Sequence, residues 1–357
     1  MCDDKSTVPV TLDADWASSE LLSHFKTHLA RYARPHWGKD SARLGLKVFA
    51  DGMTNVVIGV FNQDSREDGT VILRIYGKST ERFIDRNREL ACMQLMHRAE
   101  YAPPLYCQFA NGVCCGFVPG RCISALEMGE PRMMQRIAVC LAQVHSVHVS
   151  DSVVSSRRPV VWDMCDWILR VPLSFSDANK DARFKELFGS LDALKAEGER
   201  LREGLSSLHS PVVFSHNDTQ ARNLVYWSCE DKISVIDYEY AGMNYAAFDL
   251  GNFFCEFSGA EELDFSRYPD EGVQKTFLKM YLGECAKLGG KDPASVSDEQ
   301  VNKWYRDAAK CALASHLVWT YWGLLQAAYS ALNYDFLRYS YVRFTEYQKR
   351  KKEVYLL

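Results

Sequence analysis

A short polar run in the middle of the chain carries residue types suited to catalysis. His216, Asn217 and Asp218 lie between the apolar stretches VVF and LVY. Asn223 precedes LVY, and Asp237 closes the next apolar stretch, ISVI. Apolar runs separated by polar turns predict three short strands, which aim these polar side chains at one point. A carboxylate that accepts a hydroxyl proton, together with an amide and a second carboxylate that bind Mg²⁺, predicts phosphoryl transfer.

The spacing makes this prediction more specific. Asp218 and Asn223 have the D-x-x-x-x-N separation found in the catalytic loop of protein kinases, where a metal-binding Asp ends the next hairpin. A single Asp or Asn in a loop is more typical of turn or helix-cap chemistry. The three residues together, with predicted strands on both sides, favour a kinase-like site.

The preceding part of the chain offers elements that could bind a nucleotide. Residues 44–61 predict a hairpin, and residues 71–76 predict a third strand with Arg74 at its centre. Residues 80–98 predict a helix that carries Glu89. In kinase-like folds, a basic residue on the third strand pairs with a Glu on the following helix and orients the ATP phosphates. An ordinary surface charge is the alternative for each residue.

Two further segments are predicted to contact ATP. The hairpin turn, which contains Gly52, Thr54 and Asn55, falls where a phosphate-covering loop belongs, because a small turn lets backbone N–H groups approach the nucleotide. Two more strands end at Pro119-Gly120. This extended segment suits a hinge between lobes whose backbone bonds an adenine edge.

The remaining sequence is mainly helical. Residues 131–148 predict a helix on which His145 and His148 are expected to be structural. Residues 151–175 show little regularity, and residues 177–208 predict a charged helical pair or one long helix. The final third is helical and rich in aromatic residues, which usually form core. The alternative is that some of them form a wall that binds a cation.

Composition limits the classes of function. The 357 residues include 47% hydrophobic and 25% charged residues, enough for two lobes with substantial cores. A formal net charge of -4 gives no electrostatic footprint for nucleic acid. The 12 cysteines are scattered without C-x-x-C spacing, so we expect thiols in a reducing compartment and no zinc site. The absence of a signal region or an apolar span predicts a cytoplasmic protein without membrane insertion, and a homodimer is left open.

Several long motifs then occur in a recognisable order. HNDTQARN, IDYEYAGMNYAAFDLGNFFCEF and ASHLVWTYWGLLQAAYSALNYDFLRYSYVRF closely resemble signature segments of the choline/ethanolamine kinase family. The resemblance spans roughly residues 46–354. It implies an α+β, bilobal, protein-kinase-like fold, with a small β-rich ATP-binding lobe at 1–119 and a larger, mainly helical lobe for catalysis and amino-alcohol binding at 120–357. It also implies transfer of the ATP γ-phosphate, with Mg²⁺, to the hydroxyl of a small amino alcohol.

The resemblance assigns roles to matching positions. Asp218 resembles the catalytic base, and Asn223 and Asp237 resemble the Mg²⁺ ligands. Asp249 and Asn252 are expected to buttress the catalytic loop. Positions associated with ATP are Gly52, Thr54, Asn55, Arg74, Glu89, Phe117 and Val118. Positions associated with the amino alcohol are Asp218, Gln220, Glu256, Trp319, Trp322, Tyr334, Phe336 and Tyr339.

Two positions depart from the family pattern. Asp51 stands where the ATP loop often has Gly, which puts the local loop geometry in doubt. Gly116 stands where a longer hinge side chain is common, so adenine recognition would rest on backbone groups.

The segment EFSGAEELDFSRYPD has the compact connection typical of ethanolamine kinases, whereas choline kinases tend to have a longer, aromatic-bearing segment. The predicted acceptor is therefore ethanolamine, on the route through CDP-ethanolamine to phosphatidylethanolamine. Three alternatives remain: a choline or dual kinase, an aminoglycoside or other small-molecule kinase, and a catalytically dead binding or scaffold protein.

Overall fold

The chain folds into two compact units. In the computed structural model, the first combines Met1–Glu81 with Met93–Pro119, and the second combines Arg82–Cys92 with Gly120–Leu357. The structure describes residues 7–8, 10–12, 18–38, 43–49, 55–64, 69–77, 80–82, 84–149, 158–170, 173–175, 177–206, 208–260, 262–330 and 332–354.

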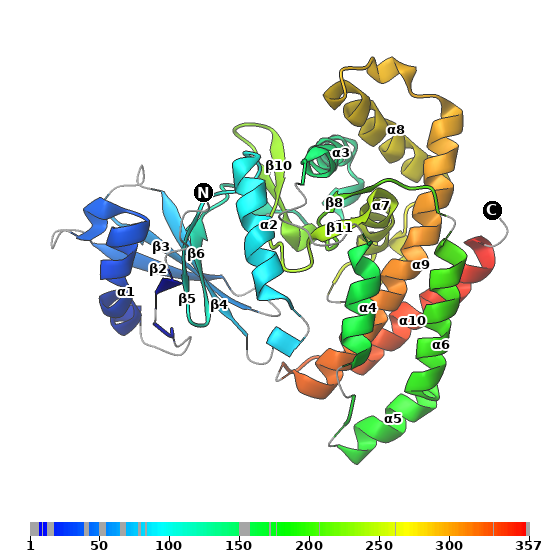
Figure 1. Ribbon diagram of the computed structural model, residues 1–357, viewed down its shortest axis with the longest axis horizontal. Coiled ribbons are helices and arrows are strands. Elements are labelled where there is room, and N and C mark those ends of the chain that lie inside the picture. Colours follow the sequence, from blue (N-terminus) through cyan, green and yellow to red (C-terminus); the bar gives the residue numbers. More distant parts are fainter. Residues whose placement is uncertain are drawn as a thin grey trace. The chain divides into compact units, whose positions relative to one another are not determined.

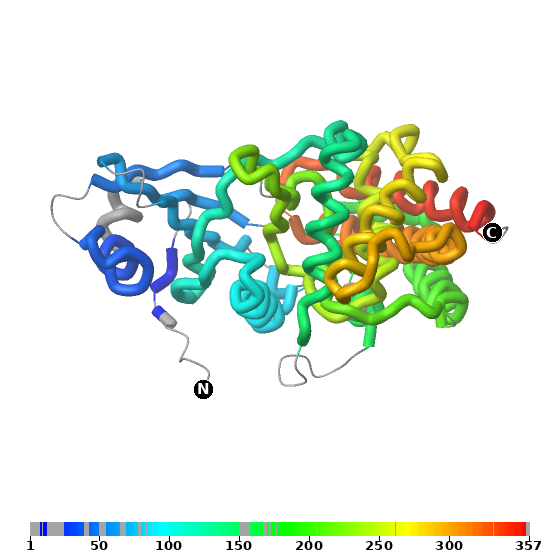
Figure 2. Tube along the Cα trace, turned by 90° about the horizontal axis from the view of Figure 1, so that it is seen from above, coloured from blue at the N-terminus to red at the C-terminus, as the bar shows by residue number. Residues whose placement is uncertain are grey.

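The first unit contains a six-stranded sheet with the order β1-β5-β6-β4-β3-β2. All neighbouring strands are antiparallel except β1 and β5. Helix α1 (Ser18–Tyr32) lies against this sheet and contributes Phe25 and Leu29 to a core shared with strand residues such as Val60 and Leu73 (Figures 1 and 2). The strands are β1 (Thr7–Val8), β2 (Leu44–Phe49), β3 (Asn55–Asn62), β4 (Thr70–Tyr76), β5 (Leu105–Phe109) and β6 (Gly112–Gly116).

Close packing explains why glycine occupies position 116. A Cβ atom there would lie 2.8 Å from Cβ of Pro103 and 3.1 Å from Cδ of Pro104. A side chain at this position would therefore collide with the segment that leads into β5, so glycine allows the close approach of the two strands.

The second unit is mainly helical. Its longest helix, α9, has 32 residues and begins with a capping box in which Ser297 and Gln300 bond reciprocally. α9 packs against α7 and α10. Gly251 of α7 allows the close contact with α9, because a Cβ atom there would lie 2.5 Å from the carbonyl oxygen of Ala308. The helices are α3 (Pro131–Ser146), α4 (Val160–Arg170), α5 (Ala178–Phe188), α6 (Leu191–Leu205), α7 (Ala246–Cys255), α8 (Glu271–Leu288), α9 (Asp298–Tyr329) and α10 (Phe336–Val354).

Two small sheets carry the polar loop. β8 (Val212–Ser215) pairs with β11 (Gly242–Tyr245), and the β9–β10 hairpin (Leu224–Trp227, Lys232–Val235) extends to β7 (Arg121–Cys122). Pairing of Ser215 with Gly242 brings the residues after β8 close to those just before β11, and Nδ2 of Asn217 donates to the carbonyl of Tyr240 at 2.9 Å. The hairpin register, together with the bond from the Ile236 N–H to the Asn223 carbonyl, likewise brings Asn223 close to the residues after β10.

The predicted hairpin (β2 and β3), the third strand β4, the helical C-terminal part and the three strands around the polar loop are confirmed. Residues 151–175, expected to be irregular, contain α4, so that prediction was wrong. Residues 177–208 form a pair of helices, because Gly189 has a φ of 73° and Ser190 caps α6.

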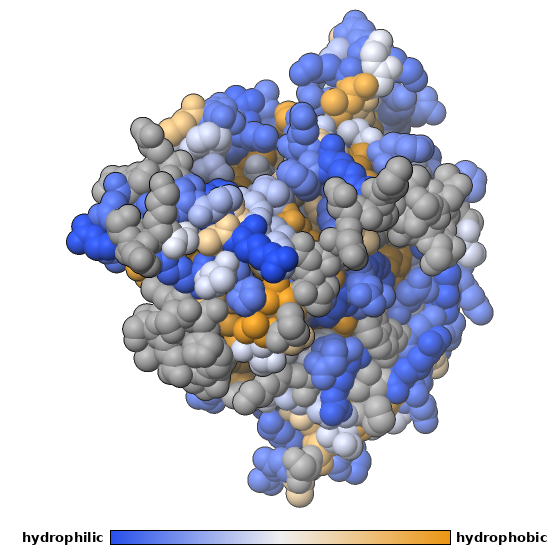
Figure 3. Space-filling view, turned by 60° about the vertical axis from the view of Figure 1, so that its left-hand side comes forward, coloured by the Kyte–Doolittle hydropathy of each residue, from blue (hydrophilic) through white to orange (hydrophobic). Residues whose placement is uncertain are grey.

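Helix α2 (Arg86–Arg98) is assigned to both units, with its residues up to Cys92 in the second. None of the helices that the structure describes is long and apolar enough to cross a membrane. On the face shown in Figure 3, hydrophilic side chains predominate and hydrophobic ones form small patches.

Candidate active site

The polar loop after β8 is held by one buried carboxylate on α7. Oδ2 of Asp249 accepts a hydrogen bond from the backbone N–H of His216 at 2.7 Å, and Oδ1 accepts one from the N–H of Asn217 at 2.6 Å. Asn217 has a φ of 68°, a left-handed conformation that a non-glycine residue adopts only when its surroundings hold it there. The prediction that Asp249 buttresses the loop is confirmed.

Two buried histidines complete this support. Nε2 of His145 lies 3.0 Å from Oδ2 of Asp249, and Nδ1 lies 2.8 Å from the hydroxyl of Tyr281, so the structural role expected for His145 is confirmed. Nε2 of His216 donates to the carbonyl of Ile236 at 2.9 Å, and Nδ1 accepts from the N–H of Asp218. Burial lowers the pKa of His216, which favours the neutral ring that this arrangement requires.

Asp218 is buried among amide donors. Nδ2 of Asn223 donates to Oδ2 of Asp218 at 2.8 Å, and Nε2 of Gln220 donates to the same oxygen at 3.1 Å. Burial first, and then the nearby carboxylate of Glu256, raise the pKa of Asp218 well above its ordinary value. A carboxylate with a raised pKa is a stronger base than an exposed one, which suits it to accept a hydroxyl proton.

Asp237 belongs to a group of three acidic residues. Oxygen atoms of Glu89, Asp237 and Glu239 lie within 4.8 Å of one another, and Asp237 has a φ of 69°. Hard oxygen donors of this kind match the ligand preference of Mg²⁺. Arg86 donates to Glu89 at 2.8 Å and to Glu239 at 3.4 Å. Sequence reasoning singled out neither Glu239 nor Arg86, although Glu239 stands two residues after Asp237 in IDYEY.

The predicted aromatic positions meet in one cluster. Ring centroids lie 5.8 Å apart for Trp319 with Trp322 and for Trp322 with Phe336, and 4.8 Å apart for Tyr334 with Phe336. Tyr339 lies 5.8 Å from Trp322. All four contacts are edge-to-face, and the faces of aromatic rings attract cations. We call these five residues the aromatic cluster.

Tyr240 is a sixth aromatic residue at this position, and sequence reasoning did not single it out. Its ring centroid lies 5.3 Å from that of Trp319, and its hydroxyl accepts a hydrogen bond from Nε1 of Trp322 at 2.9 Å. The motif IDYEY contains it three residues after Asp237, so a signal was present.

Asn252 connects the polar loop to the aromatic cluster. Its Nδ2 donates to the hydroxyl of Thr219 at 3.2 Å. Its Oδ1 accepts from the hydroxyl of Ser315 at 2.7 Å and from Nε1 of Trp319 at 2.8 Å. The expected buttressing role of Asn252 is confirmed, and the residue also fixes the indole ring of Trp319.

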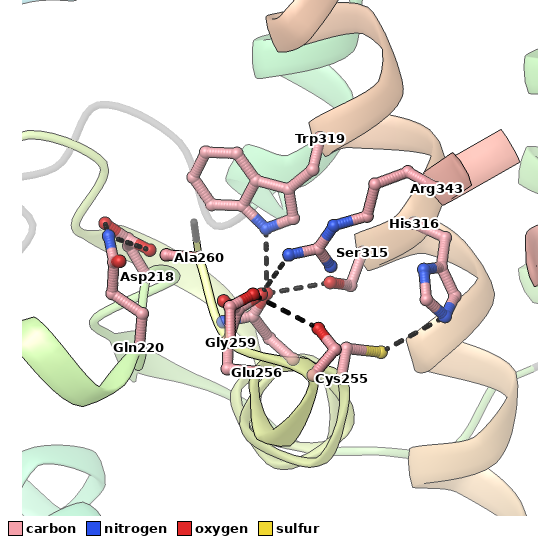
Figure 4. A network of polar contacts seen from close by, with 12 residues as sticks. Asp218, Gln220, Cys255, Glu256, Gly259, Ala260, Ser315, His316, Trp319 and Arg343 are labelled. Atoms are coloured by element: carbon pink, nitrogen blue, oxygen red, sulfur yellow. Dashed lines mark hydrogen bonds and ion pairs between the residues drawn. The ribbon is translucent and has the colours of Figure 1, made fainter. Parts of the chain in front are cut away.

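Glu256 lies at the start of the 3-10 turn that follows α7. Its Oε1 accepts a hydrogen bond from Nη2 of Arg343 at 2.6 Å, and both side chains are buried (Figure 4). Burial alone would lower the pKa of Arg343, but the Glu256 carboxylate raises it above its ordinary value. Sequence reasoning missed Arg343, since this contact spans 87 residues and leaves no local pattern.

A separate pocket of about 240 Å³ lies where α5, α9 and α10 meet, and Tyr334 and Phe336 contribute to its wall. The wall also contains two cations, Lys180 and Arg183, and one carboxylate, Asp335, which pairs with Arg183 at 2.9 Å, so the net charge of these residues is positive and disfavours an ammonium group. We therefore do not assign this pocket to an amine.

Comparison with known proteins identifies the family. Residues 46–348 match the family model described as choline/ethanolamine kinase. The chain belongs to the choline/ethanolamine kinase family. Ethanolamine kinase 1 of Mus musculus is 37% identical over 327 residues, which cover 91% of this chain and 88% of the mouse protein. Ethanolamine kinase 2 of Rattus norvegicus is 37% identical over 326 residues, which cover 91% and 80% of the two chains.

A solved structure supports the kinase-like fold of this family member. The structure of an ethanolamine kinase from Plasmodium vivax superimposes with a TM-score of 0.75 at 23% identity, covering 95% of this chain and 98% of that one. The predicted fold class is thereby confirmed.

The nucleotide positions predicted from the family motifs lie mainly in the first unit. Gly52 and Thr54 lie outside the described residues. Asn55 begins β3, and Arg74 is buried within β4. Phe117 and Val118 follow β6, and the Phe117 ring stacks on Phe49 at 6.4 Å. Glu89 belongs to the second unit, and its pairing with Arg74 stays a prediction.

Proposed function

We propose that this protein transfers the γ-phosphoryl group of ATP to the hydroxyl of ethanolamine, forming phosphoethanolamine, the first step of the CDP-ethanolamine route to phosphatidylethanolamine. The main support is the position of buried Asp218, which accepts a hydrogen bond from Asn223. Asn252 connects the loop that carries Asp218 to the aromatic cluster, through hydrogen bonds with Thr219 and Trp319. A proton acceptor and a surface suited to an ammonium group are thus joined within one unit. Both named relatives are ethanolamine kinases.

Each group has a role in this reaction. Asp218 accepts the proton from the ethanolamine hydroxyl as that oxygen attacks the γ-phosphorus, and the bond from the γ-phosphorus to the β–γ bridging oxygen breaks to release ADP. Mg²⁺ bound by Asn223 and Asp237 would neutralise phosphate charge. Gln220 orients the Asp218 carboxylate, and Glu256 with the aromatic cluster holds the ammonium group. Positioning and charge neutralisation supply most of the rate.

The first unit and the hinge serve the nucleotide in this proposal. Arg74, oriented by Glu89, fixes the phosphates, and the turn with Gly52, Thr54 and Asn55 covers them. The backbone at Phe117 and Val118 bonds the adenine. Residues 1–119 are then the ATP-binding lobe, and residues 120–357 carry catalysis and amino-alcohol binding.

We place the reaction in the cytoplasm. All eleven cysteines in the described part of the chain are free, and most of them are buried. Free thiols in this number are typical of a reducing compartment.

Choline is a second candidate acceptor, because the aromatic cluster suits a trimethylated ammonium. Ethanolamine is preferred because its N–H donors require an acceptor, and Glu256 supplies one. The test is Mg-ATP-dependent phosphorylation of ethanolamine, its monomethyl and dimethyl derivatives, and choline, measured side by side. We expect kcat/KM to be highest for ethanolamine and to fall with each methyl group. A maximum at choline would support the second candidate, and no transfer to any of the four would overturn the proposal.

A further inference from the structure

The Glu256 carboxylate has two oxygens in different situations. Oε1 accepts from Arg343 at 2.6 Å. Within the described part of the chain, Arg343 is the only residue that donates a hydrogen bond to the Glu256 carboxylate, so Oε2 has no protein donor there. Because Glu256 is only 5% exposed, it needs a partner to remain charged. The contact with Arg343 therefore leaves one oxygen for a ligand.

Stability does not explain this ion pair well. Arg343 is 1% exposed, and among the described residues its Nε and Nη1 atoms have no hydrogen-bond partner. The guanidinium instead packs over the rings of Tyr339 and Phe265, at 5.5 Å and 5.8 Å from their centroids. Removing two ions from water costs more than a single hydrogen bond returns, so buried pairs of this kind are often no better for stability than apolar residues.

The position of the pair suggests another use. Figure 4 shows Asp218 and Arg343 on opposite sides of Glu256, with the indole of Trp319 beside them. Tyr339 belongs to the aromatic cluster and precedes Arg343 by one helical turn, so the guanidinium supports both the ring and the carboxylate. Arg343 itself lies behind Glu256 and does not replace the carboxylate as an acceptor.

We propose that Arg343 is a positioning residue, which fixes Glu256 so that Oε2 accepts an N–H of the acceptor's ammonium group, and that it thereby sets the preference for amines with N–H groups over quaternary ammonium. This inference rests on the proposed function and deepens it. A primary ammonium needs a correctly placed acceptor, whereas a quaternary ammonium has no N–H donor and depends on aromatic faces. Losing Arg343 would therefore penalise ethanolamine much more than choline.

The first test compares KM and kcat for ethanolamine and choline in Arg343→Met and Arg343→Lys. We expect Arg343→Met to raise the ethanolamine KM roughly ten- to a hundredfold, the range for a hydrogen bond to a charged group, with little change in kcat or in the choline KM. Arg343→Lys keeps the charge and should restore part of the difference. Equal increases in both KM values would indicate a collapsed pocket and would overturn the inference.

Arg350→Met is the matched control. Arg350 lies on the same helix, is largely buried and pairs with Glu346 at 2.6 Å, whereas Arg343 pairs with Glu256. Its replacement removes a similar ion pair from α10 and should leave the ratio of the two KM values unchanged. If Arg350→Met shifted the ratio of the ethanolamine KM to the choline KM as much as Arg343→Met does, the effect would belong to α10 in general and the inference would be overturned.

A double-mutant cycle with Glu256→Gln covers the case in which Arg343→Met does not fold, because the double variant contains no unpaired buried charge. If Arg343 acts through Glu256, Arg343→Met has no further effect on the ethanolamine KM in the Glu256→Gln background. If Arg343→Met raised the ethanolamine KM a further tenfold or more in the Glu256→Gln background, this inference would be overturned and the proposed function would not be affected. Failure of the unaltered protein to phosphorylate ethanolamine would overturn the proposed function and this inference together, so the two failures are distinguishable.

Discussion

The amide nitrogen of Asn223 donates to both the carbonyl oxygen and the carboxylate of Asp218, at 2.9 Å and 2.8 Å. Since the nitrogen is directed at Asp218, the amide oxygen is the atom of Asn223 that remains to bind a cation. One side chain can therefore orient the proposed base and contribute to a Mg²⁺ site at the same time. This double use gives a physical reason for the five-residue separation of the two.

Replacing Asp218 with Asn tests the proposed base. Positioned general bases contribute about 10²–10⁴-fold, so Asp218→Asn should lower kcat by that order while the KM for ATP stays the same. The variant should melt no lower than the unaltered protein, because a neutral amide carries no cost of burying charge. Asp231→Asn, in the turn of the β9–β10 hairpin, is the control. Near-normal turnover in Asp218→Asn would remove this residue from the role of base.

Replacing Asp249 with Asn tests the support of the loop. An amide in place of the carboxylate sets a donor either against the N–H of Asn217 or against both the N–H of His216 and the His145 ring. We expect a loss of about 2–3 kcal/mol in the free energy of unfolding and a fall in kcat larger than the change in either KM. Urea denaturation and steady-state kinetics check this. A variant with unchanged kcat would show that the loop keeps its geometry without the carboxylate.

Replacing Trp322 with Ala tests the aromatic cluster. A cation–ring interaction contributes about 0.5–2 kcal/mol, so the KM for the amino alcohol should rise roughly 2- to 30-fold, with the KM for ATP unchanged. Trp304→Ala is the matched control, because Trp304 lies on the same helix and packs against Tyr281 away from the cluster. An unchanged amine KM in Trp322→Ala would make this residue part of the core only.

The contacts of Glu197 should make the free energy of unfolding depend on pH. It bonds to the hydroxyl of Tyr347 at 2.5 Å and pairs with Lys351, which connects α6 to α10. Burial alone would raise its pKa, but Lys351, Tyr347 and Arg200 lower it from 4.5 to about 2. Because the folded pKa is depressed, this contribution is present above pH 4.5 and is lost as the pH falls through about 2.

Glu197→Gln should therefore lower the free energy of unfolding at pH 7 by about 2–3 kcal/mol, and the difference should shrink as the pH falls from 4 to 2. Urea denaturation across this range measures it. Glu199→Gln, on the exposed side of α6, should have no effect at either pH. A difference that stays constant down to pH 2 would contradict the ion-pair explanation.

The features of this molecule that could be predicted from its sequence are those determined by residues close together in the chain. Apolar runs separated by polar turns predict the strands around Asp218, and helical spacing places Asp249 and Asn252 on one face of α7. The contacts of Arg343 with Glu256 and of His145 with Asp249 join residues 87 and 104 positions apart. Such contacts depend on how helices pack, and no periodicity within either helix reveals the partner.

The position of Asn252 has a consequence for how this family can change. Its Oδ1 accepts hydrogen bonds from both Ser315 and Trp319. Its Nδ2 donates a hydrogen bond to Thr219, the residue next to Asp218. A substitution at Trp319 that suits a new acceptor would therefore disturb the loop that carries out the chemistry. Trp322 and Tyr339 have no such connection to Asn252 in the described contacts. Substitutions at these two residues could therefore change the preferred amine without disturbing the loop through Asn252.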